Sequence, residues 1–188
     1  MGRTRLSNYV IQRRLLACLS VVSFISIIPV RTAVATVSPV PAYRLRLFNT
    51  HTGKRLDIVY RRGESYISEA LTRLDEYLRD HRTGEVRHYD PRVFDLLNDL
   101  NTKLGRPNSE IDIVCGYRSP WSNEFLRMQG HGVAVHSLHM QAMAIDIRMP
   151  GVKTAILRDT ALALHRGGVG YYAKADFVHV DVGRVRRW

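Results

Sequence analysis

Two short strands near the C-terminal end each have an apolar face and a face with polar side chains. In AIDIRM (144–149), apolar residues alternate with Asp146, and in FVHVDV (177–182) valines alternate with His179 and Asp181. Successive residues of a strand point to opposite faces of a sheet, so the apolar residues predict a core face. The polar residues must then share the other face. Asp146 there is either a structural ion or a metal ligand.

The remaining pattern predicts one α+β domain, because helical segments precede a group of short strands. Asp90 and Pro91 begin one helix and Gly105 ends it. We expect a small antiparallel sheet, helices packed on one side, and the metal site on the sheet face. The predicted elements are a hairpin of 43–49 and 55–60, strands 110–115, 144–149, 169–172 and 177–182, and helices 68–79, 91–104, 120–130 and 152–166.

The N-terminal segment has the pattern of a secretory signal peptide. Arg13 and Arg14 precede the apolar run LLACLSVVSFISIIPV, and RTAVA then ends at Ala35. The run is shorter than the roughly 20 residues that a spanning helix needs. The alternative is an uncleaved signal anchor, which would keep the protein at a membrane. We predict a signal peptide at 1–35, a linker at 36–42 and a single domain at 43–188.

Charge and cysteine content constrain the exported domain further. The formal charge of the whole chain is +11, and 23 basic and 17 acidic residues remain after residue 35. This balance suits an anionic partner: a nucleic acid, a membrane surface or a cell-wall polymer. Only Cys115 remains after residue 35, so no internal disulfide is possible. The domain must be stabilised by its core or by a metal.

Three side chains converge if the two C-terminal strands are neighbours: His139, Asp146 and His179. Two imidazoles and one carboxylate suit a catalytic Zn²⁺, because three protein ligands leave the fourth position to water. Asp176 and Asp181 flank His179, and each is a candidate to take a proton from that water. The alternative is that these residues are structural.

Three segments resemble the zinc D-Ala-D-Ala peptidase family. SLHMQAMAID (137–146) is similar to its S-x-H-x(6)-D segment, and VCGYRSPWSN (114–123) is similar to its S-G-Y-R-S-P-x-x-N segment. DFVHVDVGRVRRW (176–188) is similar to its C-terminal D/E-x-x-H segment. The resemblance runs from about residue 43 to residue 188. The branch that it resembles most is the exported murein endopeptidases, which cut crosslinks between diaminopimelate residues.

The resemblance implies a role for each matching residue. His139, Asp146 and His179 match the zinc ligands, and Asp176 matches the general base. Strand geometry alone favours Asp181 as the base, so it is the second candidate; alternatively it orients His179.

Other matching residues would contact the substrate. Arg118 matches the arginine that binds the carbonyl oxygen as negative charge develops on it, an interaction worth about 2 to 4 kcal/mol of barrier. Ser137 matches a serine that contacts substrate, and we expect Asn123 to have a supporting role.

Two residues depart from the family pattern. Ala142 replaces a glycine, and if that position needs a positive φ, alanine costs about 1 kcal/mol and could shift His139. Cys115 stands where serine is commoner, and we expect it to pack as a small apolar residue. We expect the basic tail, 184–188, to be solvated rather than bound to anionic wall polymer.

The sequence therefore predicts an exported zinc peptidase of the periplasm or cell envelope. It would hydrolyse amide bonds of peptidoglycan stems by metal-activated water, as a monomer without a nucleic-acid partner. One alternative is a zinc-containing peptidoglycan-binding module that has lost turnover, which Ala142 motivates. Another is a basic nucleic-acid binder, against which the export signal argues.

Overall fold

The computed structural model describes residues 39–130 and 133–188. Residues from Ser38 to Trp188 form one compact unit. The predicted signal peptide and the first part of the predicted linker, 36–38, lie outside the described residues. None of the helices within the described ranges has the length and apolar character needed to cross a membrane.

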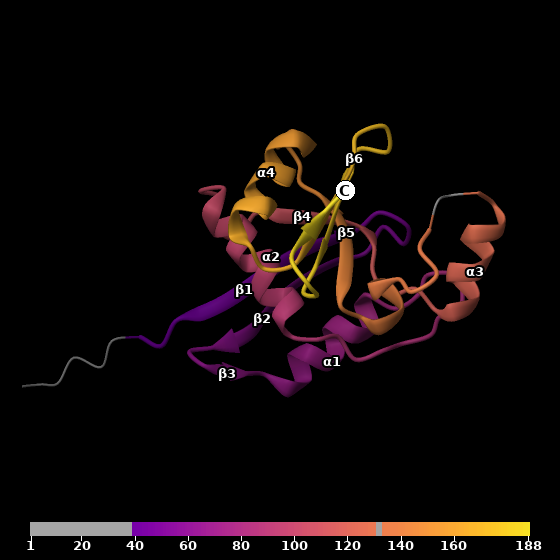
Figure 1. Ribbon diagram of the computed structural model, residues 1–188. Coiled ribbons are helices and arrows are strands. Elements are labelled where there is room, and N and C mark those ends of the chain that lie inside the picture. Colours follow the sequence, from indigo (N-terminus) through magenta and orange to yellow (C-terminus); the bar gives the residue numbers. More distant parts are fainter. Residues whose placement is uncertain (1–38, 131–132) are drawn as a thin grey trace, which may run out of the picture. The chain divides into compact units, whose positions relative to one another are not determined.

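One sheet of eight strands forms the centre of this unit, in the order β3-β2-β1-β4-β5-β7-β6-β8 (Figure 1). Neighbouring strands are antiparallel except for the β1–β4 and β6–β8 pairs. The strands are β1 (Ala42–Asn49), β2 (Arg55–Arg62), β3 (Ser65–Tyr66), β4 (Glu110–Cys115), β5 (Ala144–Arg148), β6 (Gly168–Tyr172), β7 (Phe177–Asp181) and β8 (Arg186–Arg187). The predicted linker ends in β1, which begins at Ala42.

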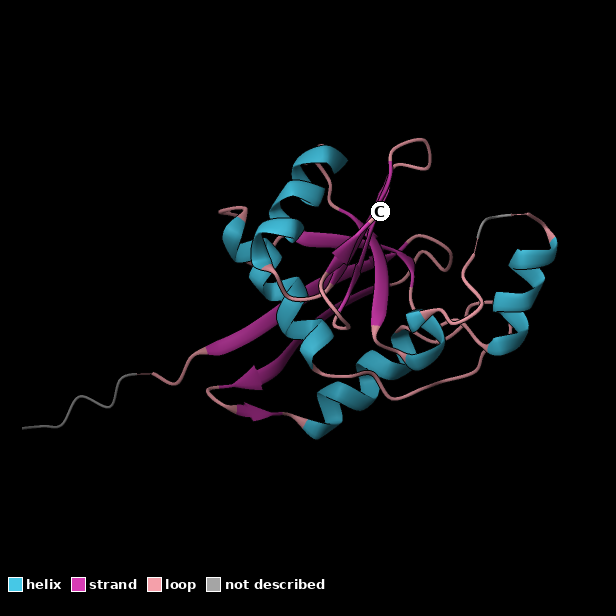
Figure 2. Cartoon of the chain, viewed as in Figure 1, coloured by secondary structure: helices cyan, strands magenta, loops and turns pink. Residues whose placement is uncertain are grey.

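Four α-helices and one short 3-10 helix accompany the sheet in the described ranges (Figure 2). Helices α2 and α4 pack on each other, and α1 contacts β2. Helix α3 stands apart from the sheet (Figure 1). The side chains that it buries are the polar Ser122 and Asn123. The helices are α1 (Ser68–Tyr77), α2 (Arg92–Lys103), α3 (Pro120–Met128), the 3-10 helix η1 (Leu138–Gln141) and α4 (Thr154–Leu164). The predicted α+β class is confirmed.

The two faces of the sheet differ as the alternation predicts. Ile147 of β5 pairs with Ile113 of β4 on one side and with Val178 of β7 on the other. All three side chains are buried in the apolar core together with residues of α1, α2 and α4. Burial of this face supplies most of the driving force for folding. The preceding residue of β5, Asp146, therefore projects from the opposite face.

Three described elements were absent from the sequence prediction: β3, η1 and β8. The most consequential is β8, because the tail 184–188 was expected to be solvated. Arg184, Val185, Arg187 and Trp188 are exposed, as expected, but Arg186 and Arg187 also pair in parallel with Gly168 and Val169 of β6. The pairing was missed because a two-residue strand is too short to produce a visible alternation pattern.

Candidate metal centre

The β5–β7 pairing brings the predicted ligands together. Strands β5 and β7 are antiparallel neighbours, and Asp146 lies directly opposite His179 in their register. Directly opposed side chains on one face are about 5 Å apart at their Cβ atoms, which is within reach of a shared ion. The predicted adjacency of the two strands is thus present in the structure.

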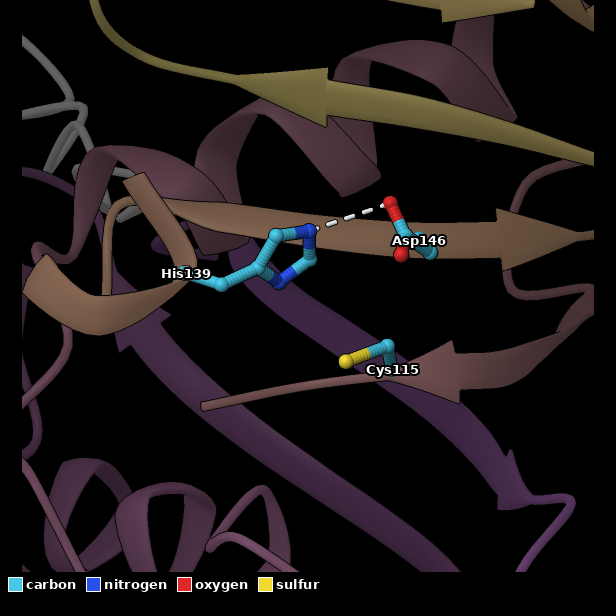
Figure 3. A group of neighbouring side chains, drawn as sticks. All are labelled: Cys115, His139 and Asp146. Carbon is cyan, nitrogen blue, oxygen red and sulfur yellow. Dashed lines mark hydrogen bonds and ion pairs between the residues drawn. The ribbon is translucent and has the colours of Figure 1, made fainter. Parts of the chain in front are cut away.

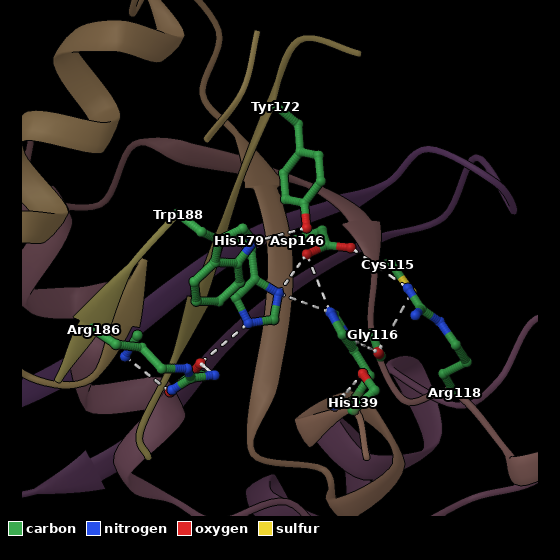
Figure 4. A network of polar contacts seen from close by, with 12 residues as sticks. Cys115, Gly116, Arg118, His139, Asp146, Tyr172, His179, Arg186 and Trp188 are labelled. Carbon is green, nitrogen blue, oxygen red and sulfur yellow. Dashed lines mark hydrogen bonds and ion pairs between the residues drawn. The ribbon is translucent and has the colours of Figure 1, made fainter. Parts of the chain in front are cut away.

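His139 reaches the same point from η1. Its Nε2 lies 3.1 Å from Asp146 Oδ1 and 3.0 Å from His179 Nδ1, and His179 Nδ1 lies 2.9 Å from Asp146 Oδ1. All three side chains are buried, with residue exposures of 2%, 5% and 7% for His139, Asp146 and His179. The three atoms form a nearly equilateral triangle, shown from one side in Figure 4.

The second nitrogen of each imidazole fixes which atom carries the proton. His139 Nδ1 lies 2.8 Å from the Gly116 carbonyl oxygen, which can only accept, so Nδ1 donates. His179 Nε2 lies 3.2 Å from Asp181 Oδ2, again an acceptor. In the neutral rings, His139 Nε2 and His179 Nδ1 are then lone-pair atoms. Two lone pairs and a carboxylate oxygen face one another, and this arrangement requires a cation or an extra proton.

The pKa values of His139 and Asp146 reflect this need for a cation or an extra proton. Burial lowers the pKa of His139, but the negative charges on Asp146 and Cys115 outweigh it and raise the pKa to about 10. Burial raises the pKa of Asp146, yet the neighbouring His139 and His179 hold it well below its usual range. Without a metal, the cluster is therefore balanced by a proton on an imidazole. Zn²⁺ can take the place of that proton.

The geometry fits zinc. Ligand atoms that lie about 2.0–2.1 Å from a tetrahedral zinc are about 3.3 Å apart, close to the separations found here. Each imidazole also donates its remaining N–H to a carbonyl or a carboxylate, the usual support of a zinc-bound histidine. His139, Asp146 and His179 can thus hold a metal through three protein atoms.

Cys115 lies beside this triad. It stands opposite Asp146 in the β4–β5 register, and its Sγ lies within 4.8 Å of ligand atoms of His139 and Asp146 (Figure 3). Burial raises the pKa of the thiol, but His139 and Arg118 outweigh it and lower the pKa. We expected Cys115 only to pack as an apolar residue, and its position beside the triad was not predicted from the sequence. Its place at the end of the predicted strand 110–115 was the available signal.

Arg118 borders the same point. Its Nη2 lies 3.7 Å from Asp146 Oδ2 and donates to Cys115 Sγ at 3.4 Å. Its buried Nε has no partner among the described residues. The position of Nη2 beside Asp146 places the guanidinium group at the edge of the triad, where it can bind a ligand oxygen.

Asp181 lies behind His179, away from the triangle of ligand atoms. Its carboxylate is fully buried and accepts hydrogen bonds from the backbone N–H groups of Gly168 and Gly183, both at 2.9 Å, and from the Arg186 guanidinium. Burial raises its pKa, but His179, Gly168 and Arg186 hold the pKa well below its usual range. This carboxylate is ionised and its oxygens are already occupied.

The structure does not bring Asp176 to the triad. Asp176 precedes β7 with a φ of 53°, a turn conformation, and its side chain is 64% exposed. Its Oδ1 accepts from Thr154 Oγ1 at 3.1 Å and its Oδ2 lies 3.8 Å from Arg148 Nη1. Three residues of strand span about 10 Å, which separates its backbone from that of His179.

Comparison with known proteins identifies the family of this chain. The family model described as peptidoglycan L,D-endopeptidase MepK matches residues 38–188. The chain belongs to this MepK family. It is 39% identical over 183 residues to a probable peptidoglycan L,D-endopeptidase MepK of Haemophilus influenzae, covering 96% of this chain and 98% of that protein. It is 37% identical over 177 residues to peptidoglycan L,D-endopeptidase MepK of Escherichia coli K12, covering 94% and 96%. No solved structure matches the chain significantly.

Two further predicted residues support the site of this MepK-family chain from outside the triad. Ser137 is the N-cap of η1, and its Oγ accepts from the His139 N–H at 3.3 Å. Asn123 Nδ2 donates to the Ala134 carbonyl at 3.1 Å, which ties α3 to the segment that leads to Ser137.

Asp80 was missed by the sequence analysis. Its buried carboxylate accepts from the Ser119 N–H at 2.8 Å and thereby holds the residue next to Arg118.

Ala142 occupies a position that favours glycine. It ends η1 in the left-handed conformation, with φ 53° and ψ 39°, and it is fully buried. The His139 side chain nevertheless keeps its contacts with Gly116, Asp146 and His179. Alanine at this position therefore does not displace the ligand.

We expect Ala142→Gly to change the free energy of unfolding by less than about 1 kcal/mol. Relief of the left-handed backbone is worth about 1 kcal/mol. Loss of a buried methyl group, about 0.8 kcal/mol, and the greater freedom of glycine in the unfolded chain oppose it. Denaturant unfolding measures the change. The control is Ala161→Gly, a buried alanine of α4 without this relief, which should cost about 1 to 2 kcal/mol. Equal losses in the two variants would show that Ala142 is unstrained.

Proposed function

We propose that this chain is a zinc-dependent peptidase that hydrolyses L,D-amide bonds in the peptide crosslinks of peptidoglycan. The observation that carries the proposal is the triangle formed by His139 Nε2, Asp146 Oδ1 and His179 Nδ1. The substrate class comes from the names of the relatives and the basic exported domain predicted from the sequence. Under this proposal the protein acts outside the cytoplasm, in the periplasm or cell envelope.

The residues around the triangle suit amide hydrolysis. When bound, Zn²⁺ would act as a Lewis acid and lower the pKa of a water molecule. The Arg118 guanidinium lies at the edge of the triad with an unpaired buried donor, and it would bind the substrate carbonyl oxygen as charge develops there. Ser137 orders the turn that carries His139, and a substrate contact from Ser137 remains part of the proposal.

The two flanking aspartates receive different roles. We propose that Asp181 orients His179, because its oxygens are already occupied by four donor groups. Asp176 remains the proposed general base on the grounds of its sequence position and exposed carboxylate. This role requires its side chain to leave Thr154 and Arg148 and turn toward the triad.

Asparagine substitutions separate these roles. If Asp176 accepts the proton, Asp176→Asn should lower kcat by about 10²–10⁴-fold and leave zinc affinity unchanged. Asp181→Asn should instead weaken zinc binding by about 10–100-fold, because an amide offers one acceptor oxygen to the four donor groups, His179 among them, that now share two. Turnover and metal affinity are measured on both purified variants. If Asp176→Asn keeps kcat within tenfold of the unmodified protein, the base lies elsewhere.

Digestion of purified peptidoglycan sacculi tests the proposed function. The protein should release soluble peptide-bearing fragments, a chelator should stop the release, and added Zn²⁺ should restore it. Sacculi that bind the protein without any release would support the alternative, a binding module that has lost turnover. The intact contacts of His139 next to Ala142 do not favour this alternative.

A further inference from the structure

Residues Arg186–Trp188 lie along β6, the neighbour of the strand β7 that carries His179. We call them the C-terminal clamp. Arg186 and Arg187 form β8, which pairs with β6. Beyond β8, the Trp188 N–H donates to the Val169 carbonyl at 3.2 Å, and the Tyr171 N–H donates to the Trp188 carbonyl at 3.0 Å. The clamp thus has backbone hydrogen bonds up to the final residue.

Arg186 connects the clamp to His179 through Asp181. Its Nη2 donates to Asp181 Oδ2 at 2.7 Å and its Nη1 donates to Oδ1 at 3.2 Å, a two-pronged contact with a fully buried carboxylate. The same Oδ2 accepts from His179 Nε2 at 3.2 Å. Charge-assisted pairs of this geometry are strong and directional. Arg186 therefore fixes the orientation of the acceptor that decides which nitrogen of His179 carries the proton.

Trp188 contacts His179 directly. The centroids of the two rings are 5.2 Å apart, and the rings make an interplanar angle of 49°. Trp188 Nε1 also donates to the Tyr172 hydroxyl at 3.0 Å. Gly170 lies opposite His179 in the β6–β7 register. A Cβ on Gly170 would lie 2.7–2.8 Å from the Trp188 indole. The space above Gly170 is therefore filled by the indole, which leaves the imidazole little freedom to rotate.

We infer that the C-terminal clamp is a positioning device for the His179 ligand: Arg186 acts through Asp181, and Trp188 acts by packing on the imidazole. This inference rests on the proposed function, because it assumes that His179 Nδ1 binds a metal. The clamp keeps the proton on Nε2 and presents the Nδ1 lone pair to His139 and Asp146. The opposite tautomer would place a proton at the position of the metal.

Metal affinity and the His179 tautomer test the clamp. Arg186→Gln removes the two-pronged contact and should lower Zn²⁺ affinity by about 10–100-fold, measured by competition with a chromophoric chelator. In ¹⁵N NMR of the metal-free protein, the His179 ring should change from the Nε2–H form to a mixture of tautomers. Arg187→Gln is the matched control, because it removes the same charge from the neighbouring residue of β8, and it should leave both readouts unchanged.

Two further variants keep the test decisive. Trp188→Phe keeps an aromatic ring but loses the hydrogen bond to Tyr172, and it should weaken Zn²⁺ binding by less than Arg186→Gln does. If Arg186→Gln does not fold, Arg186→Lys keeps the charge without the two-pronged contact and should show the same change of tautomer.

Unchanged Zn²⁺ affinity and tautomer in the folded Arg186 variant would overturn the inference, as would an equal loss in Arg187→Gln. Failure of the unmodified protein to bind Zn²⁺ would instead overturn the proposed function. The tautomer measurement would still decide whether Arg186 fixes the His179 ring.

Discussion

Replacement of His139 by alanine should abolish peptidoglycan hydrolysis, with a loss in kcat of at least about 10³-fold. Under the proposed function, loss of one of three ligands would remove the metal, whose stabilisation of developing charge would be worth several kcal/mol, and each 1.36 kcal/mol is a factor of ten in rate. Asp146→Ala and His179→Ala should have the same effect, because each contributes one corner of the same triangle. Steady-state turnover of soluble crosslinked peptides measures the loss.

Controls for this prediction separate the loss of the metal from general damage. The double variant His139→Ala/His179→Ala should be no slower than either single variant, because residues that act as a unit are not additive. His165→Asn is a matched histidine control: it lies at the C-terminal end of α4 with φ 51°, a conformation that asparagine also adopts. A His139→Ala protein that keeps its turnover would contradict the proposed mechanism.

Replacement of Arg118 by methionine should lower kcat by about 10²–10³-fold while Zn²⁺ affinity stays within a few-fold. The guanidinium lies beside the triad but is not one of its three ligands, and its buried Nε is unpaired. An interaction formed only with developing charge affects kcat more than KM. Burial of Arg118 also predicts some loss of stability, so unfolding must be measured on the same variant.

Two further substitutions serve as controls for the Arg118→Met prediction. Arg118→Lys keeps the positive charge but not the planar guanidinium group, and it should keep only part of the activity. Arg127→Met removes an arginine of α3 whose described ion pair is with Glu124, and it should leave kcat unchanged. If Arg118→Met raises KM without lowering kcat, Arg118 binds the ground state and the transition state equally and does not favour the developing charge.

The sequence predicted those parts of the fold that depend on local pattern. Strict alternation in β5 and β7 identified the core face, and turn and cap residues located the hairpin and the start of α3 at Ser119, whose side chain accepts from the Ser122 N–H. The positions of Asp146 and His179 on the non-core face followed from the same alternation. Their direct pairing depends on strand order, which periodicity does not contain.

Other parts of the site depend on tertiary contacts that leave no local signal. The tail appeared solvated because its basic residues suggest exposure, yet Arg186 meets a buried carboxylate five positions earlier. Asp80 lies outside every predicted element, yet its carboxylate binds a backbone N–H 39 residues away. The sequence position of Asp176 indicated a base, whereas the structure places its carboxylate on Thr154 and Arg148.

The most direct test of the account is mass spectrometry of the products formed from a purified crosslinked muropeptide dimer, with metal-free protein and with Zn²⁺ restored. The dimer should be cut at an L,D-amide bond of its crosslink only when Zn²⁺ is present, and the His139→Ala variant should give no product in either condition. Cleavage by metal-free protein, or an intact dimer with Zn²⁺ bound to the protein, would contradict the account.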